Sequence, residues 1–269
     1  MLSKKIAAVE SYLMKHFDYN MSRKLVNFNK LAMIIEPRCH HRLKWTIINT
    51  LHFLGEDYDL LFIGSHSSVK YMKKKLPDIE CHVETIHTDN LNSIDYSKIM
   101  MNKSLIEKYN YEHIIVFQTD SILLKPLPDY IYSHNYIGAI DYMKRNNKSI
   151  MKVYNGGFSY RKRSFLLHCL DNISMHDINA YRRNNDMVLF DEDVMEDFYY
   201  SNCLYIQNEE ININIFGQNQ EFFNNDLCTI HSYDKDSDRF MSFNCVISLL
   251  NKSHNYIQLN YYKQYIEKL

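Results

Sequence analysis

Glycine and proline are scarce in this chain, which has six glycines and four prolines in 269 residues. No Pro/Gly/Ser-rich linker divides the sequence, so we expect a single domain over residues 1–269. No apolar stretch approaches the ~20 residues that a membrane span needs. Residues 1–17 carry several charges where a signal peptide needs an unbroken apolar core, so we expect a cytoplasmic protein.

The sequence also lacks a dominant charge and paired metal-binding motifs. The formal net charge is −1, which provides no basic field and makes nucleic acid a poor candidate partner. The six cysteines are far apart and form no C-x-x-C pair, which argues against a zinc site and against a dense disulfide framework. The thirteen histidines include no His-Glu-x-x-His spacing.

Apolar runs and helical spacings alternate along the first half of the chain. This alternation predicts an α/β fold with a mostly parallel central sheet and helices on both faces. The expected strands are 31–36, 59–64, 81–86, 113–118, 136–141, 203–206 and 227–231. The expected helices are 3–17, 41–54, 67–76, 93–109, 161–171, 190–200 and 240–250. Ligands of such sheets bind beyond the carboxyl ends of the strands, where Glu36, Arg38, Ser65 and Asp120 fall.

Two of the six glycines are adjacent in Asn155-Gly156-Gly157. Neighbouring glycines serve a backbone with positive φ, or one that a ligand approaches closely. The alternative is an ordinary turn between two elements. The polar segment 142–152 upstream is either a mobile lid or a simple surface loop.

Three further motifs carry groups suited to chemistry. Gln118-Thr119-Asp120 ends an apolar strand, Asp191-Glu192-Asp193-Val194 lies in an expected helix, and His231 lies on a short strand. Each has a structural alternative. Asp120 could cap the end of a strand, the acidic cluster could complement a helix dipole, and a lone strand histidine could be structural.

The order of these motifs resembles the GT-A class of nucleotide-sugar glycosyltransferases. The opening Leu31-to-Arg38 stretch and the following helix, ending in Phe53-Leu54-Gly55, also resemble a largely uncharacterised glycosyltransferase-like family of giant viruses, fungi and bacteria. The resemblance spans about residues 31–235. A bias towards Asn, Tyr, Ile and Lys fits an AT-rich giant-virus genome, and would place the protein in the host cytoplasm.

The resemblance implies a GT-A-like domain with a nucleotide-sugar half over about 25–135, an acceptor and catalytic half over about 136–250, and an N-terminal helix in 1–20. It implies that Asp120 and His231 bind a divalent cation, Mn²⁺ or Mg²⁺. Gln118 departs from the family's Asp-x-Asp pattern, which puts metal use in question. The residues implied in donor binding are Glu36, Arg38, Ser65, Gln118, Asp120, Asn155, Gly156, Gly157 and Lys235.

Comparison with Glu-Asp-Val motifs of inverting enzymes points to Asp193 as the general base, with Glu192 as the alternative. The implied activity is transfer of a sugar, hexosyltransferase-like, from a nucleoside-diphosphate sugar, with UDP favoured, to a glycan or protein. A second hypothesis is a catalytically degenerate GT-A fold that binds a nucleotide sugar or glycan. A third hypothesis, a metal-dependent phosphohydrolase, is disfavoured because the sequence lacks the multiple strand-end Asp and His ligands that a two-metal centre requires.

Overall fold

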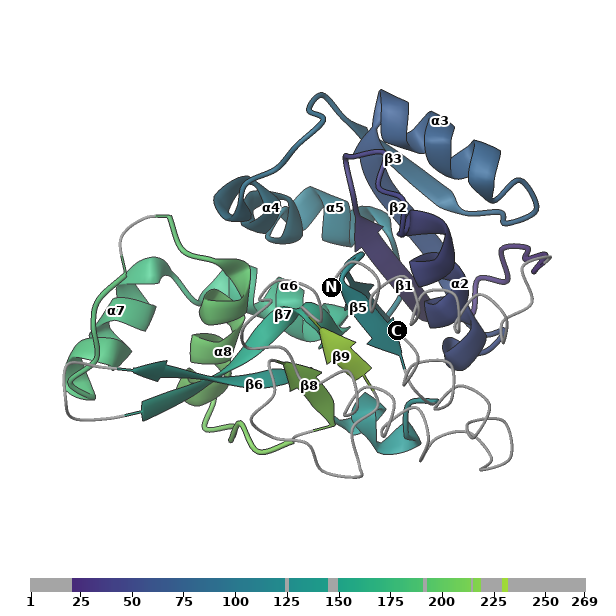
Figure 1. Ribbon diagram of the computed structural model, residues 1–269. Coiled ribbons are helices and arrows are strands. Elements are labelled where there is room, and N and C mark those ends of the chain that lie inside the picture. The colour runs from purple at the N-terminus through teal and green to yellow at the C-terminus, as the bar shows by residue number, and fades with distance from the viewer. Residues whose placement is uncertain are drawn as a thin grey trace, which may run out of the picture.

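The computed structural model describes residues 21–123, 126–144, 150–190, 193–213, 215–218 and 229–231. A six-stranded sheet in the order β3-β2-β1-β4-β7-β6 forms its centre, with a three-stranded sheet β5-β9-β8 beside it. The predicted fold class, an α/β domain with a mostly parallel sheet and helices on both faces, is confirmed (Figure 1). The helices predicted over 3–17 and 240–250 lie outside the described residues.

Four parallel strands build one side of the sheet: β1 (Lys30–Ile35), β2 (Asp59–Ser65), β3 (His82–Ile86) and β4 (His113–Phe117). Every residue of β2 is buried. A continuous buried run is typical of a parallel strand that is covered on both faces. These strands lie within one residue of the predicted bounds, and their carboxyl ends meet at one edge of the sheet.

The helices of this side are α2 (Leu43–Leu54), α3 (His66–Lys75), α4 (Ser93–Met100) and α5 (Lys103–Lys108). The single helix predicted over 93–109 is wrong, because the chain breaks between α4 and α5. The side chain of Asn102 accepts a hydrogen bond from the amide of Leu105, which starts a new helix.

Two long antiparallel strands complete the sheet: β6 (Tyr136–Lys144) and β7 (Ile150–Lys162). The predicted Asn-Gly-Gly turn is wrong, because Asn155, Gly156 and Gly157 lie inside β7. Neither glycine has a positive φ. Gly138 of β6 pairs with Ser159 and the next β6 residue pairs with Asn155, so residues 156–158 form a bulge against β6. The predicted loop 142–152 contains the ends of both strands, and its residues 145–149 are outside the described part.

Three helices surround the β6–β7 hairpin: α6 (Arg163–Asn172), α7 (Met175–Asn184) and α8 (Glu196–Ile206). Figure 1 shows them grouped on the opposite side of the molecule from β2 and β3. The helix predicted over 190–200 begins later, because Met195 has an extended backbone and is the N-cap of α8. The strand predicted over 203–206 is also wrong, since these residues are the last turn of α8. The sequence analysis missed α7, which a Ser174–Asp177 capping box starts.

The small sheet joins β5 (Ser121–Leu123), β9 (Thr229–His231) and β8 (Phe216–Gln218). A short 3-10 helix, η1 (Asp129–Ser133), lies between β5 and β6. Among the described helices, none is long and apolar enough to cross a bilayer. The four described cysteines are free thiols: Cys39, Cys81, Cys169 and Cys203.

Candidate functional site

A cavity of about 560 Å³, here called the strand-end cavity, opens at the carboxyl ends of β1 and β4. Its other sides come from the β3–α4 loop, α4, the bulge of β7 and the first turn of α8. The cavity therefore lies where parallel α/β sheets bind ligands. Seven of the residues predicted for the site line it: Glu36, Arg38, Gln118, Asp120, Asn155, Gly156 and Gly157.

The remaining predicted site residues are placed differently. Ser65 does not line the cavity; its hydroxyl donates to the carbonyl of Pro37 (2.7 Å) and caps α3. Asp193 does not line it either. Its side chain is 64% exposed and forms an ion pair with Lys98 (3.2 Å). Glu192 and Lys235 lie outside the described residues.

Glu36 and Arg38 form a fixed ion pair at the end of β1. Glu36 is buried, and its carboxylate accepts from Nε (2.8 Å), Nη2 (2.9 Å) and the backbone amide of Arg38 (3.0 Å). The hydroxyl of Thr119 donates to the same carboxylate (3.0 Å). Because Glu36 is fully engaged, the more exposed guanidinium of Arg38 is the group that this pair presents to the cavity.

Two further basic residues, His40 and Arg42, line the cavity next to this pair. Arg42 is buried, and its backbone amide donates to Nδ1 of His40 (3.3 Å). Burial lowers the pKa of His40, against the attraction of Glu36, so its imidazole is neutral at pH 7. The permanent positive charge on this side of the cavity therefore comes from the two arginines.

Helix α2 positions the segment that carries Asp120. The hydroxyl of Thr46 donates to the carbonyl of Thr119 (3.4 Å), and the side chain of Asn49 makes two bonds with the backbone of Leu123 (2.8 and 2.9 Å). Asp120 itself is 8% exposed. These contacts fix the backbone of Asp120 at the edge of the sheet where the parallel strands have their carboxyl ends.

The small sheet brings the backbone of His231 close to that of Asp120. In the antiparallel pairing of β5 with β9, His231 is opposite Ser121, the residue after Asp120. Carboxylate and imidazole are both ligands that a divalent cation such as Mn²⁺ accepts. Among the residues with described side chains, no group of three or more His, Cys, Asp or Glu could hold a metal ion.

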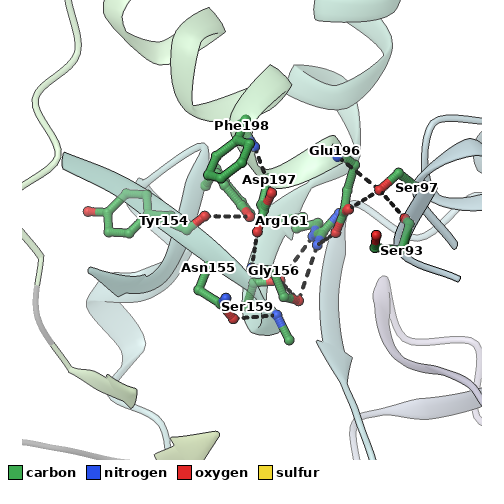
Figure 2. A network of polar contacts seen from close by, with 12 residues as sticks. Ser93, Ser97, Tyr154, Asn155, Gly156, Ser159, Arg161, Glu196, Asp197 and Phe198 are labelled. Carbon is green, nitrogen blue, oxygen red and sulfur yellow. Dashed lines mark hydrogen bonds and ion pairs between the residues drawn. The ribbon is translucent and has the colours of Figure 1, made fainter. Parts of the chain in front are cut away.

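The first turn of α8 supplies two carboxylates to the other side of the cavity, Glu196 and Asp197 (Figure 2). Glu196 is buried and both of its oxygens are engaged. Oε1 accepts from Nη2 of Arg161 (3.1 Å), and Oε2 accepts from the hydroxyl of Ser97 on α4 (2.7 Å). A Cβ on Gly156 would lie 2.5 Å from Oε1 of Glu196, so this close approach explains the glycine.

Asp197 is less tightly held than its neighbour. Oδ1 accepts from the amide of Phe198 (2.8 Å) and Oδ2 from the amide of Gly156 (3.3 Å). Burial, followed by the negative charge of Glu196, raises the pKa of Asp197 to about 7, although both amides and Arg161 oppose the shift. A carboxyl group with such a pKa can accept or release a proton near neutral pH.

The sequence analysis missed Glu196, Asp197, His40, Arg42 and Arg161. A signal for the first two was present, since Glu196-Asp197 repeats the Glu-Asp pair of Glu192-Asp193 four residues later, next to apolar residues that continue into a helix. Arg161 gave no local signal, because its importance depends on a partner 35 residues away.

Comparison with known proteins assigns the chain to a family. A family described as "Protein of unknown function (DUF5672)" matches residues 80–238, which is more than half of the chain. The chain belongs to this family. The DUF5672 match includes Asp120, Asp197 and His231. A search of curated proteins gives no match.

Two solved structures resemble this DUF5672 chain. Apo xyloside xylosyltransferase 1 from mouse has a TM-score of 0.50 and 8% sequence identity, over 77% of this chain and 98% of that chain. A 4-diphosphocytidyl-2C-methyl-D-erythritol synthase from Anaerococcus prevotii has a TM-score of 0.40 and 8% identity, over 89% of this chain and 97% of that chain. The likeness to the xylosyltransferase shows a GT-A-like, glycosyltransferase-like fold. The expected link to giant viruses stays a prediction.

Proposed function

We propose that this DUF5672 protein transfers a sugar from a nucleoside-diphosphate sugar, with UDP favoured, to a hydroxyl group of a glycan or protein, with inversion. One observation carries the proposal. The strand-end cavity is lined by Asp120, after the carboxyl end of β4, by Asp197 on α8, and by Arg38 and Arg42. Transfer of a glycosyl group needs these two kinds of group, cations for the leaving diphosphate and a base for the acceptor.

In this proposal the diphosphate lies near the two arginines. The guanidinium of Arg38 is oriented by Glu36 and presents donors that suit phosphate oxygens. Orientation before binding lowers the entropy that is lost when the donor binds. The β3–α4 loop, which contributes Asn90 and Asn92 to the cavity, provides amide groups near the same site.

Asp120 and His231 would hold a divalent cation, Mn²⁺ or Mg²⁺. Their chemistry fits, since Asp120 supplies an oxygen ligand, Gln118 can supply an amide oxygen, and the β5–β9 pairing brings His231 next to this segment. When bound, the cation would neutralise charge on the leaving diphosphate.

Asp197 is the general base in this proposal. It takes the proton from the acceptor hydroxyl, whose oxygen forms a bond to the anomeric carbon. The bond from that carbon to the diphosphate oxygen breaks, and the diphosphate leaves with the electron pair. A base works best when its pKa lies near the working pH, and the environment of Asp197 has this effect.

The geometry favours Asp197 over Asp193 and Glu196 for this role. Asp193 is directed to Lys98 and does not line the cavity. Glu196 lines it, but an arginine and a serine occupy both of its oxygens. Each oxygen of Asp197 also accepts one hydrogen bond, but the donors are neutral backbone amides and not an arginine side chain. The carboxyl group of Asp197 is therefore the one that burial and the charge of Glu196 leave able to take a proton near neutral pH.

The test is a donor-hydrolysis screen over nucleotide sugars, with and without Mn²⁺, followed by calorimetry on each donor. We expect one donor class to bind, to be hydrolysed slowly and to respond to the metal ion, with both signals reduced in Asp120→Asn. Tight donor binding without hydrolysis or transfer to any acceptor would instead support the degenerate binding module. No binding of any nucleotide sugar would reject the transferase and leave, of the second hypothesis, only a module that binds a glycan.

A further inference from the structure

Arg161 on β7 is fully buried and does not line the strand-end cavity. Its Nε donates to the hydroxyl of Ser159 (3.0 Å), and its Nη2 donates to the carbonyl of Gly156 (3.2 Å) and to Glu196 (3.1 Å). The guanidinium also lies 5.2 Å from the ring centroid of Tyr136. This one side chain thus connects β6, β7 and α8.

The pair between Arg161 and Glu196 is poorly explained as a stabilising contact. Removing two charges from water costs several kcal/mol per ion, and the attraction repays that cost only when all polar atoms are satisfied. Here only one nitrogen of the guanidinium reaches Glu196, and Nη1 has no hydrogen-bond partner among the described residues. Well-packed apolar residues of similar size are often as stable as a buried ion pair, so the geometry calls for another reason.

Two sets of contacts connect the pair of Arg161 and Glu196 with Asp197 (Figure 2). Along β7, Arg161 and Ser159 hold the carbonyl of Gly156, whose own amide donates to Asp197. Along α8, Arg161 holds Glu196, the residue before Asp197. From α4, Ser97 holds the other oxygen of Glu196 and also accepts from its amide (3.1 Å).

We propose that Arg161 is a positioning residue, which fixes the Asp197 carboxylate in the strand-end cavity by holding Gly156 on one side and Glu196 on the other. This inference rests on the proposed function in assigning Asp197 a role in proton transfer. The positioning itself is a property of the free protein. It can therefore be measured without any substrate.

Several charged or titratable groups act on Asp197. Glu196 is its neighbour on α8, Arg161 comes from β7, Tyr96 from α4 and Tyr136 from β6. Glu196 raises the pKa of Asp197, whereas Arg161 lowers it by a smaller effect. Both tyrosines have pKa values raised by burial, so they stay neutral near pH 7.

The experiment compares Arg161→Gln, Glu196→Gln and the double variant. Removing one charge should move the midpoint for ionisation of Asp197 by about one pH unit. The midpoint should rise in Arg161→Gln, fall in Glu196→Gln, and take a value between Glu196→Gln and wild type in the double variant. Opposite shifts follow from the two charges alone, so a positioning role is read from the double variant, whose shift should depart from the sum of the two single shifts.

Arg182→Gln is the matched control. Arg182 is also a buried arginine, and its hydrogen bonds to Asn202 of α8 (3.1 Å) and to the carbonyl of Val188 (2.5 Å) go to residues outside this network. We expect it to lower stability without moving the midpoint of Asp197. In Arg161→Gln we also expect kcat to fall about 10- to 100-fold, with the donor KM changed less than about threefold, because misplacement affects the reacting group and not the diphosphate.

The midpoint is read by ¹³C NMR of labelled aspartate carboxyl groups in the free protein, with Asp197→Asn to assign the signal. Unchanged midpoints in Arg161→Gln and Glu196→Gln, or a double variant whose shift equals the sum of the two, would overturn the proposal. If the Arg161→Gln variant does not fold, Arg161→Lys takes its place in the same comparison, because it keeps the charge and removes the contacts of the guanidinium. Failure to find any sugar transfer would remove the proposed function, while these NMR shifts would still test the positioning.

Discussion

Two regions of the molecule supply charge to the same cavity, and they hold that charge in different ways. At the end of β1, Glu36 and Arg38 are two residues apart, and the arginine side chain is 55% exposed. Between β7 and α8, Arg161 and Glu196 are 35 residues apart, and their side chains are 0% and 6% exposed. The first pair joins neighbouring residues and has an exposed arginine. The second pair joins residues far apart in the sequence and is buried.

This difference affects what each region can do. A local pair with an exposed arginine can be changed at little cost to the fold. A buried pair that links separate elements cannot adjust without disturbing all of them. We therefore expect changes on the β1–β4 side to affect donor binding, and changes on the β7–α8 side to affect turnover, pH dependence and stability together.

The largest effects should come from two changes, Asp197→Asn and Gly157→Val. If Asp197 accepts the acceptor proton, Asp197→Asn should reduce transfer by roughly two to four orders of magnitude, the range usual for loss of a general base. Donor affinity should stay close to wild type, because Asp197 is a base for the acceptor and not a ligand of the diphosphate. A transfer assay combined with calorimetry of donor binding measures both.

Asp193→Asn is the matched control, since it makes the same chemical change on the exposed carboxylate that is paired with Lys98. We expect it to retain nearly full activity. The opposite result, with Asp193→Asn inactive and Asp197→Asn active, would identify Asp193 as the base, as the motif comparison predicted. Glu192→Gln tests the alternative in that comparison.

The next largest effect should come from Gly156→Ala. The new Cβ would lie 2.5 Å from Oε1 of Glu196 and 2.8 Å from Nη2 of Arg161, so the buried pair must separate. Overpacking of this kind costs about 1–3 kcal/mol. We expect that loss in urea unfolding, together with at least a tenfold loss of turnover.

Gly157→Val tests the other glycine of the bulge. We expect it to abolish transfer with the fold largely intact, because the new side chain would enter the cavity that Gly157 lines. Normal transfer by Gly157→Val would mean that this part of the bulge lies away from the donor and the acceptor.

On the β1–β4 side, Asp120→Asn should weaken donor binding about tenfold in the presence of Mn²⁺ and less in its absence. The reason is that a neutral amide is a weaker ligand for a hard cation than a carboxylate. Calorimetry with and without Mn²⁺ measures this difference. An equal loss in both conditions would show that Asp120 acts on the donor without a cation.

The same contrast explains which parts of the structure the sequence predicted. The strands β1, β2 and β4 are local apolar runs, so their position and the strand-end residues Glu36 and Asp120 could be found from the pattern alone. The break at Asn102 was missed although its cap signal was local.

The β7–α8 side was misinterpreted because its features depend on distant partners. Gly156 indicated a turn, but its reason is a carboxylate 40 residues later. The acidic run ending at Asp193 and the pair Glu196-Asp197 both satisfy the preference of a helix N-terminus for negative charge. Only tertiary packing against Arg161 and Ser97 determines which of them starts α8.

The last effect concerns stability and pH, and it distinguishes the two regions without any substrate. Because the folded pKa of Asp197, about 7, is above its ordinary value of 3.8, the folded protein binds this proton more tightly than the unfolded chain. The contribution of Asp197 to the free energy of unfolding therefore falls as the pH rises from about 4 to 7. Asparagine has no such ionisation, so Asp197→Asn should gain stability relative to wild type between pH 5 and pH 8, by roughly 2–3 kcal/mol. Urea unfolding of both proteins at the two pH values measures this gain. Asp193→Asn, which makes the same change on an exposed carboxylate, is measured at the same two pH values as the control. If Asp197→Asn gains no more than this control, the β7–α8 region does not destabilise the ionised carboxylate, and the contrast between the two regions fails at this residue.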